Sequence, residues 1–211
     1  MERICCIIGA MEPGEIVLPD GALVIAADGG LAHLERRGIV PDLIVGDFDS
    51  LGRAPEGANV IRHPVEKDDT DMMLAVRTGL ARGCSQFLLY GGLGGRLDHA
   101  YANLQTLVFL AEHGARGWLL GGGIAASAVR NGHLTFAAGR RGVISVFCPN
   151  GEARGVYLMG LYYPLTDAVL TSGFPLGVSN QFTGQAASVA VRDGILLAMW
   201  EQAEGTLPEH L

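Results

Sequence analysis

About the first 120 residues alternate short apolar runs with amphipathic segments. The runs are apolar at nearly every position, as in Phe87-Leu88-Leu89-Tyr90, which is expected of parallel strands that are covered on both faces. This alternation is typical of parallel strands joined by crossover helices. The predicted strands span residues 4–9, 22–27, 42–46, 59–63, 86–91 and 117–121.

Two of the amphipathic segments have clear helical spacing, with apolar residues every three or four positions. The first helix starts after Thr70, a suitable N-cap, and stops near Gly83. The second carries apolar residues on one face until Gly114. The apolar positions are Met72, Val76 and Leu80 in the first helix, and Leu97, Tyr101, Leu104, Val108 and Ala111 in the second.

The pattern changes after Gly121-Gly122-Gly123 to short apolar stretches separated by Gly, Asn, Pro and Asp. We expect strands at 133–137, 142–147, 156–159, 167–172, 186–192 and 195–199, with a hairpin turn at Arg192-Asp193-Gly194. The predicted fold class is therefore α/β with two domains. Residues 1–124 form a mostly parallel, Rossmann-like α/β domain, and residues 125–211 form an antiparallel β-sandwich.

Composition narrows the class of protein. Hydrophobic residues make up 49% of the chain and charged residues 18%, which favours a globular fold. The formal net charge of -7 disfavours a general nucleic-acid or anionic-membrane surface, because both need clustered Lys and Arg. The four cysteines match neither a disulfide framework nor a zinc site, and no targeting or membrane-spanning segment is evident, so we expect a cytoplasmic location.

The aspartates concentrate where predicted strands end or helices begin. Asp28, Asp47, Asp49 and Asp98 come after predicted strands, and Asp71 opens a helix just after Asp68 and Asp69. Each alone is explained by a turn or a helix cap. Together they would lie at the carboxyl edge of one parallel sheet, where ligands bind and where like charges repel unless a cation is present. Magnesium, which prefers carboxylate and phosphate oxygens, is the natural cation.

A glycine-rich turn follows the strand at 86–91 and leads into the second predicted helix. It runs from Gly91 to His99 and includes Gly94, Gly95 and Arg96. Such turns let backbone N–H groups approach phosphate oxygens, and an arginine adds a planar cationic fork. Lys67 is a second candidate phosphate contact, although a solvated surface lysine is an equal alternative. The chain lacks a G-x-x-x-x-G-K-[ST] sequence, which excludes a P-loop.

These residues resemble the thiamine pyrophosphokinase (thiamin diphosphokinase) family nearly end to end. The resembling segments are Ala26 to Gly30, Pro41 to Ser50, Lys67 to Asp71, Gly91 to His99 and Gly177 to Asn180. The resemblance implies an α/β nucleotide-handling domain, a β-sandwich and a homodimer with its active sites at the subunit interface. It also implies magnesium-dependent conversion of thiamine and ATP into thiamine diphosphate and AMP.

The resemblance also assigns roles to individual residues. Asp47, Asp49 and Asp71 would bind the metal, while Asp28, Lys67, Thr70, Gly94, Gly95, Arg96 and Asp98 would surround ATP and the transferred group. Asp71, Asp98 and Arg96 are the expected catalytic residues, and the choice of base between Asp98 and Asp71 stays open. Ser179 and Asn180 would face thiamine from the partner subunit. Phe182 stands near the place where some family members have a tryptophan that covers the substrate.

Three other functions remain open from the sequence. Another diphosphokinase would use the same chemistry on a different alcohol, such as a pterin. A haloacid-dehalogenase-like phosphatase would use Asp47 as nucleophile and Asp49 as general acid, although no matching later lysine and paired aspartates follow. A non-catalytic module would bind nucleotide and magnesium without turnover.

Overall fold

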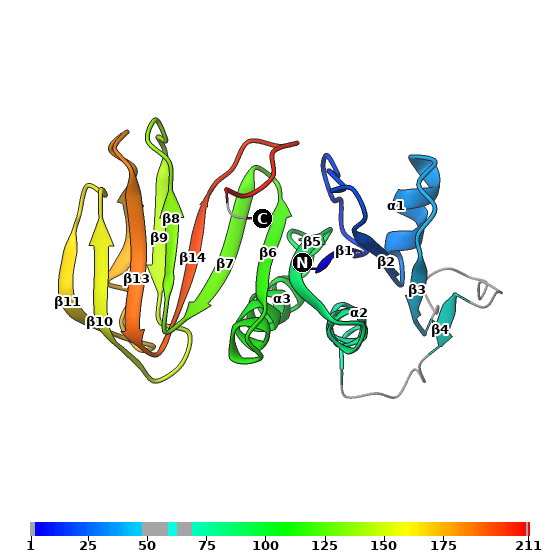
Figure 1. The fold of residues 1–211 in the computed structure, drawn as a ribbon, viewed down its shortest axis with the longest axis horizontal. Coiled ribbons are helices and arrows are strands. Elements are labelled where there is room, and N and C mark those ends of the chain that lie inside the picture. Colours follow the sequence, from blue (N-terminus) through cyan, green and yellow to red (C-terminus); the bar gives the residue numbers. More distant parts are fainter. Residues whose placement is uncertain (1–2, 48–58, 63–68, 210) are drawn as a thin grey trace. The chain divides into compact units, whose positions relative to one another are not determined.

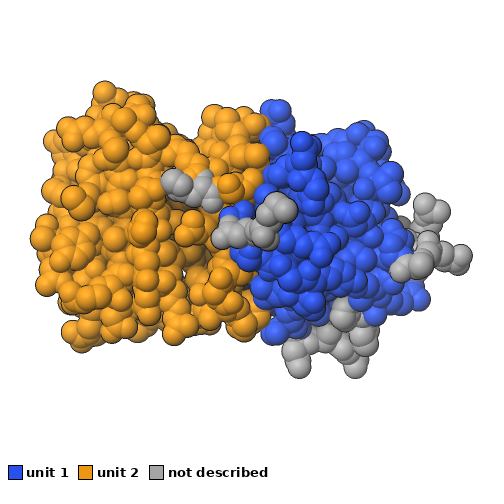
Figure 2. Space-filling view, in the orientation of Figure 1, with its two compact units in different colours: residues 1–106, 119–122 blue, residues 107–118, 123–211 orange. Residues whose placement is uncertain are grey.

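The structure is a computed structural model that describes residues 3–47, 59–62, 69–209 and 211. The chain divides into two compact units, residues 1–106 with 119–122 and residues 107–118 with 123–211 (Figure 2). The predicted domain boundary after residue 124 stays a prediction. In chain order the elements (Figure 1) are β1 (Arg3–Ile8), β2 (Leu23–Ala27), α1 (Gly30–Arg36), β3 (Leu43–Gly46), β4 (Val60–Arg62), α2 (Asp71–Ala81), β5 (Cys84–Tyr90), α3 (Leu97–Glu112), β6 (Arg116–Gly121), β7 (Ile124–Arg130), β8 (His133–Phe136), β9 (Val143–Phe147), β10 (Glu152–Met159), β11 (Leu165–Thr171), β12 (Gly177–Gln181), β13 (Ala187–Asp193) and β14 (Ile195–Glu201).

The first unit contains a parallel sheet, as the continuous apolar runs predict. Its strands follow the order β5-β1-β2-β3-β4, and every pairing between these neighbours is parallel. Helix α1 packs on β1 and β2, and helix α2 packs on β1, β2, β3 and β5. Ile7, Ile8, Phe87 and Leu88 have no exposed surface, which places the centre of this core on β1 and β5.

The second unit is the predicted antiparallel sandwich. Strands β12-β9-β14-β7 form one set of neighbours, and β11-β10-β13-β8 form the other sheet. Strand β13 contacts both β7 and β14 of the facing set. On β13, alternate residues Ala187, Val189 and Val191 are buried, as expected of a strand with one face on the core. Helix α3 and strand β6 each divide between the two units.

The predicted hairpin at Arg192-Asp193-Gly194 is wrong. Strand β13 pairs with β8 and β10, whereas β14 pairs with β7 and β9. The turn therefore carries the chain from one sheet of the sandwich to the other. The tight Asp-Gly sequence fits both kinds of turn, and only the pairing partners of the flanking strands distinguish them.

Three elements have weak signals in the sequence and were not predicted. Helix α1 has seven residues and a glycine N-cap without a side-chain hydrogen bond. Strand β7 has the sequence IAASAVR, whose alanines have low strand propensity, yet residues 125–129 are buried. Strand β12 has the sequence GVSNQ, which is typical of a turn. Tertiary packing stabilises all three where local propensity does not.

Helix α3 is 16 residues long, and its residues Leu107 and Leu110, which belong to the second unit, are buried. A Cβ at Gly117 of β6 would lie 2.5 Å from Leu110 Cδ1, so α3 and β6 pack closely at this glycine. Throughout the part of the chain that the structure describes, no helix is both long and apolar enough to cross a membrane.

We predict that Gly79→Ala destabilises the first unit. A Cβ at Gly79 would lie 2.6 Å from Cε1 of the buried Phe87 ring and 3.1 Å from Cys5 Sγ. This overpacking should outweigh the gain in helix propensity and lower the free energy of unfolding by about 1–2 kcal/mol in denaturant titrations. Gly173→Ala is the control, because no heavy atom lies within 4 Å of its added Cβ. A Gly79→Ala protein as stable as the original would show that α2 moves freely away from β5.

Candidate active site

A cavity of about 370 Å³ opens at the carboxyl ends of the parallel strands in the first unit. Segments that follow β1, β2, β3 and β5 contribute to it, together with the start of α2 and one face of α3. This is the edge where open parallel sheets bind ligands. Its lining residues are Gly9, Ala10, Met11, Ala27, Asp28, Asp47, Thr70, Asp71, Met72, Gly91, Arg96, His99 and Asn103.

Two backbone segments meet at one wall of the cavity. The Gly9 N–H donates to Tyr90 O at 2.8 Å, and the Met11 N–H donates to Gly91 O at 3.0 Å. A Cβ at Gly9 would lie 2.7 Å from Gly91 O, and a Cβ at Gly91 would lie 2.6 Å from Gly9 O. Only glycine at both positions allows this approach, so the residues after β1 and β5 form a continuous surface.

Three of the predicted aspartates line this cavity, as expected from their positions at strand ends. Asp28 is 8% exposed and has a φ of 43°, a left-handed conformation that turns the chain sharply between β2 and α1. Asp47 directly follows β3, and Asp71 is the first residue of α2. Thr70 caps α2, since its Oγ1 accepts a hydrogen bond from Met73 N at 3.2 Å. Carboxylates and a helix N-terminus thus face the same space.

Arg96 supplies a cation in the cavity wall, and it forms a two-point contact with Asp98. Arg96 Nε donates to Asp98 Oδ1 at 3.1 Å, and Arg96 Nη2 donates to Asp98 Oδ2 at 2.5 Å. Hydrogen bonds from Arg96, with a smaller contribution from the His99 N–H, lower the pKa of Asp98 to about 2. A carboxylate with so low a pKa is a weak base near neutral pH. The Nη1 donors of Arg96 are not used in this pair and are available to an anion.

Asn103 is a cavity residue that the sequence analysis missed. Its side chain is buried, and its Nδ2 donates to Gly92 O at 2.8 Å, which fixes the start of the glycine-rich turn. His99 and Asn103 lie four residues apart on one face of α3, and Arg96 lies three residues before His99, directly before the helix begins. That spacing is the signal that would have found Asn103. Ala10 and Met11 were also missed, although they follow an apolar strand just as the aspartates do.

Other predicted site residues have different positions. Gly94 and Gly95 belong to the glycine-rich turn but do not line the cavity, and neither does Asp98. A Cβ at Gly95 would lie 2.5 Å from Met11 Sδ, so this glycine makes room for Met11. Asp49 and Lys67, like the neighbouring Asp68, lie outside the described residues. Among the residues that are described, no group of three or more His, Cys, Asp or Glu side chains is arranged to hold a metal ion by itself.

The three predicted thiamine contacts lie on or next to β12 in the second unit. Ser179 is exposed and has a φ of 57°, and its N–H donates to Ser145 Oγ at 3.1 Å. Asn180 is buried: its Oδ1 accepts from Tyr163 N and Gln181 N, both at 2.9 Å, and its Nδ2 donates to Tyr163 O at 2.7 Å. Phe182 is also buried, with its ring 5.0 Å from that of Phe136. Their contact with thiamine stays a prediction.

Both units match models of one protein family. Residues 17–119 match the model "Thiamin pyrophosphokinase, catalytic domain", and residues 137–196 match "Thiamin pyrophosphokinase, vitamin B1 binding domain". The two matches follow each other in the order of the two units. The chain belongs to the thiamin pyrophosphokinase family.

Individual relatives agree with this family of enzymes. The chain is 28% identical over 182 residues to thiamine pyrophosphokinase of Bacillus subtilis (strain 168), which covers 83% of this chain and 85% of the relative. Crystal structures of family members from Bacillus subtilis and Geobacillus thermodenitrificans each superpose with a TM-score of 0.79 and 23% identity. They cover 95% and 97% of this chain, respectively, and 100% of each solved chain, so the fold is that of the family.

We predict that Arg96 controls the ionisation of Asp98. In the original protein an NMR titration should give Asp98 a pKa of about 2. Arg96→Ala should raise this pKa toward the ordinary value of about 4, because the hydrogen bonds that stabilise the carboxylate are lost. Arg77→Ala is the matched control, since Arg77 pairs with Asp69 instead. An unchanged Asp98 titration in Arg96→Ala would contradict the contact.

Proposed function

We propose that this family member transfers the β,γ-pyrophosphate of ATP to the hydroxyl of thiamine, which gives thiamine diphosphate and AMP. The observation that carries the proposal is the cavity at the carboxyl edge of the sheet, where Asp28, Asp47 and Asp71 meet Arg96. Carboxylates and an arginine in one cavity suit a metal-bound polyphosphate better than a neutral ligand. The vitamin B1 binding match in the second unit supports thiamine as the acceptor.

The phosphate groups would lie between Arg96 and the start of α2. The side chain of Thr70 already satisfies Met73 N. Asp71 and Met72, in the first turn of this 11-residue helix, line the cavity, so the helix N-terminus would offer its N–H groups to the phosphates. Arg96 would use its remaining guanidinium donors on phosphate oxygens while Asp98 holds its orientation. Lys67 would add a second positive charge. Binding and alignment of the triphosphate would provide most of the catalysis.

Magnesium fits this donor set. The ion is commonly held by one or two carboxylates together with phosphate oxygens and water, so it does not need a cluster of three protein ligands. Asp47 and Asp71 lie in the cavity wall, and Asp49 follows two residues after Asp47. These three residues would hold the ion, which would neutralise phosphate charge during transfer.

In the proposed reaction the thiamine hydroxyl oxygen forms a bond to the β-phosphorus of ATP. The bond between that phosphorus and the oxygen bridging to the α-phosphorus breaks, and AMP leaves with the bridging oxygen. A carboxylate accepts the hydroxyl proton. Asp71 is the better candidate base, because the contact with Arg96 leaves Asp98 weakly basic.

Thiamine would bind through Ser179, Asn180 and Phe182 of the second unit, contributed by the partner subunit of a cytoplasmic homodimer. Ser179 is the exposed member of the three and would make the direct polar contact. Asn180 is occupied by Tyr163 and Gln181, so it would act by fixing the turn that presents Ser179. Phe182 is buried and would support the site through the packing of its ring against Phe136.

The decisive assay combines the protein with ATP, magnesium and thiamine, followed by chromatography of the products. We expect equal amounts of AMP and thiamine diphosphate, and no reaction after removal of magnesium with a chelator. Asp71→Asn should lower kcat by about 100-fold or more, because both a metal ligand and a base are lost. Asp20→Asn is the matched control, since Asp20 is exposed and does not line the cavity.

Other products would favour other functions. Phosphate release from ATP without an alcohol would indicate a phosphatase, and AMP formation with a pterin alcohol but not with thiamine would change the acceptor. Normal turnover by a folded Asp71→Asn protein would show that Asp71 is neither ligand nor base.

The shared site can be tested by mixing two inactive variants. Asp71→Asn damages the first unit, and Ser179→Lys places a positive charge against the thiamine cation. If each site uses both subunits, reassociated mixed dimers contain one intact site, and activity should recover to about a quarter of the original. If one chain builds a whole site, every mixed dimer has two defective sites and the mixture stays inactive. Each variant alone, taken through the same reassociation, is the control.

A further inference from the structure

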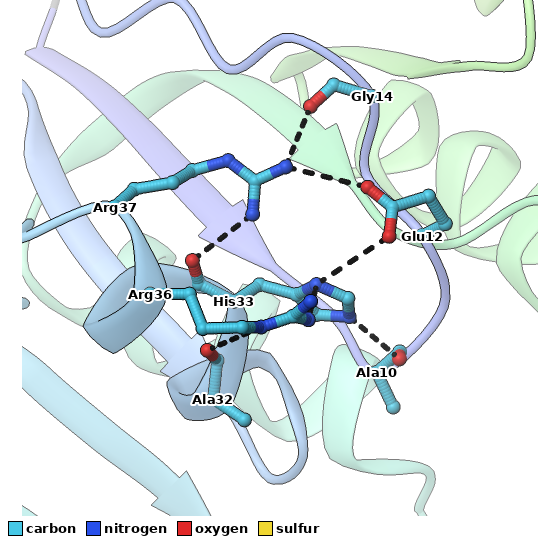
Figure 3. A network of polar contacts seen from close by, with 7 residues as sticks. All are labelled: Ala10, Glu12, Gly14, Ala32, His33, Arg36 and Arg37. Carbon is cyan, nitrogen blue, oxygen red and sulfur yellow. Dashed lines mark hydrogen bonds and ion pairs between the residues drawn. The ribbon is translucent and has the colours of Figure 1, made fainter.

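A polar network joins helix α1 to the segment that forms one wall of the cavity. Figure 3 shows the His33 ring between α1 and this segment, with Arg36 and Arg37 beside it. His33 Nε2 lies 3.0 Å from Ala10 O, and Ala10 lines the cavity. His33 itself is 7% exposed and does not line the cavity. It therefore contacts the cavity wall from the side that faces away from the cavity.

The partners of His33 determine its tautomer. Ala10 O only accepts hydrogen bonds, so Nε2 must carry the proton and donate. Arg36 Nη2 lies 2.7 Å from His33 Nδ1, and a guanidinium only donates, so Nδ1 must accept. Arg36 Nε is also fixed by Ala32 O at 3.2 Å. Glu12 Oε2 also lies 3.9 Å from Nδ1, so the imidazole has partners at both nitrogens and is oriented toward Ala10.

Arg37 strengthens the same connection further along the segment, at Glu12 and Gly14. Its Nη1 donates to His33 O at 3.0 Å, while its Nη2 donates to Gly14 O at 3.1 Å and to Glu12 Oε1 at 3.3 Å (Figure 3). The Glu12 contact is exposed and contributes little, but the backbone contacts fix the path of residues 10–14. His33 in α1 and Arg37, which directly follows the helix, therefore hold this segment at two points.

The segment transmits its position to the phosphate-facing turn. Met11 N donates to Gly91 O at 3.0 Å, and the Met11 sulfur occupies the space that a side chain at Gly95 would need. Gly95 directly precedes Arg96, which lines the cavity. A shift at Ala10 would displace Met11 and, through it, the turn that positions Arg96.

We propose that His33 is a positioning residue for the nucleotide site: it holds the segment from Ala10 to Gly14 and thereby the glycine-rich turn before Arg96. This inference rests on the proposed binding of ATP in the cavity. His33 does not contact the reacting atoms. Its loss should weaken nucleotide binding more than it slows the chemical step.

Two substitutions separate the hydrogen bond from simple packing. His33→Phe keeps a ring of similar shape but removes the N–H donor. The Ala10 carbonyl oxygen then lacks the hydrogen bond that His33 supplied. His33→Gln places an amide N–H near the position of Nε2 and should restore the contact. His113→Phe is the matched control, because His113 is exposed directly after the end of α3 and belongs to the second unit.

The experiment measures binding of a non-hydrolysable ATP analogue by calorimetry and amide hydrogen exchange by mass spectrometry. We expect His33→Phe to weaken binding by about 5- to 10-fold, the usual effect of one lost hydrogen bond of this kind, and to speed exchange in residues 9–14. In turnover, the KM for ATP should rise by a similar factor while kcat changes by less than about twofold. His33→Gln should recover most of the affinity, and His113→Phe should match the original protein.

Three results would overturn the proposal. These are unchanged affinity in His33→Phe, equal loss in His33→Gln, or faster exchange spread over the whole first unit without a local effect. If the original protein bound the analogue but made no thiamine diphosphate, the proposed function would fail and the His33 comparison would still decide this inference. If it bound no nucleotide, both would fail as stated, and exchange at residues 9–14 would show only whether His33 holds the segment.

Discussion

The contact between the Gly9 and Gly91 backbones is the constraint on which the site depends. Parallel pairing of β1 with β5 brings Ile8 opposite Tyr90, and the chains then continue side by side beyond the ends of both strands. Each glycine lies where the other's carbonyl oxygen would collide with a side chain. This approach closes the wall of the cavity and gives Met11 and Arg96 a common support.

The carboxyl edge of the parallel sheet also brings charged side chains into the cavity. The sheet edge gathers Asp28, Asp47 and Asp71, and their mutual repulsion is tolerated where a cation or an arginine can lie among them. Asp28 adopts a left-handed backbone conformation, which is uncommon outside glycine and is concentrated at functional sites in proteins. The pairing of Arg96 with Asp98 orients the guanidinium before any anion arrives. A site organised in this way would lose little free energy in rearrangement on binding the proposed polyphosphate.

In the second unit, the short polar sequence of β12 is held in place by hydrogen bonds of its Asn180 side chain. Ser179 has a left-handed conformation inside β12, where the register with β9 shifts between Gly177 and Asn180. Asn180 compensates for the irregular pairing by satisfying backbone groups of Tyr163 and Gln181 with its side chain. Ser179 is therefore exposed at an irregularity of β12 whose backbone is held by the Asn180 side chain. The proposed role of Ser179 in thiamine binding needs this combination of access and fixed position.

The sequence by itself determined the fold class, the parallel sheet, the sandwich and the family. Continuous apolar runs such as the one at Phe87, and motifs in fixed order, carry this information locally. The convergence of Asp28, Asp47 and Asp71 was also predictable, because strand ends share one edge of a parallel sheet. Tertiary structure alone decided that the turn after Arg192 joins two sheets, that alanine-rich β7 is a strand, that Asn180 is occupied by backbone groups and that His33 supports the cavity wall. These features depend on partners that are distant in the sequence, and neither propensity nor spacing reports which distant groups a residue will meet.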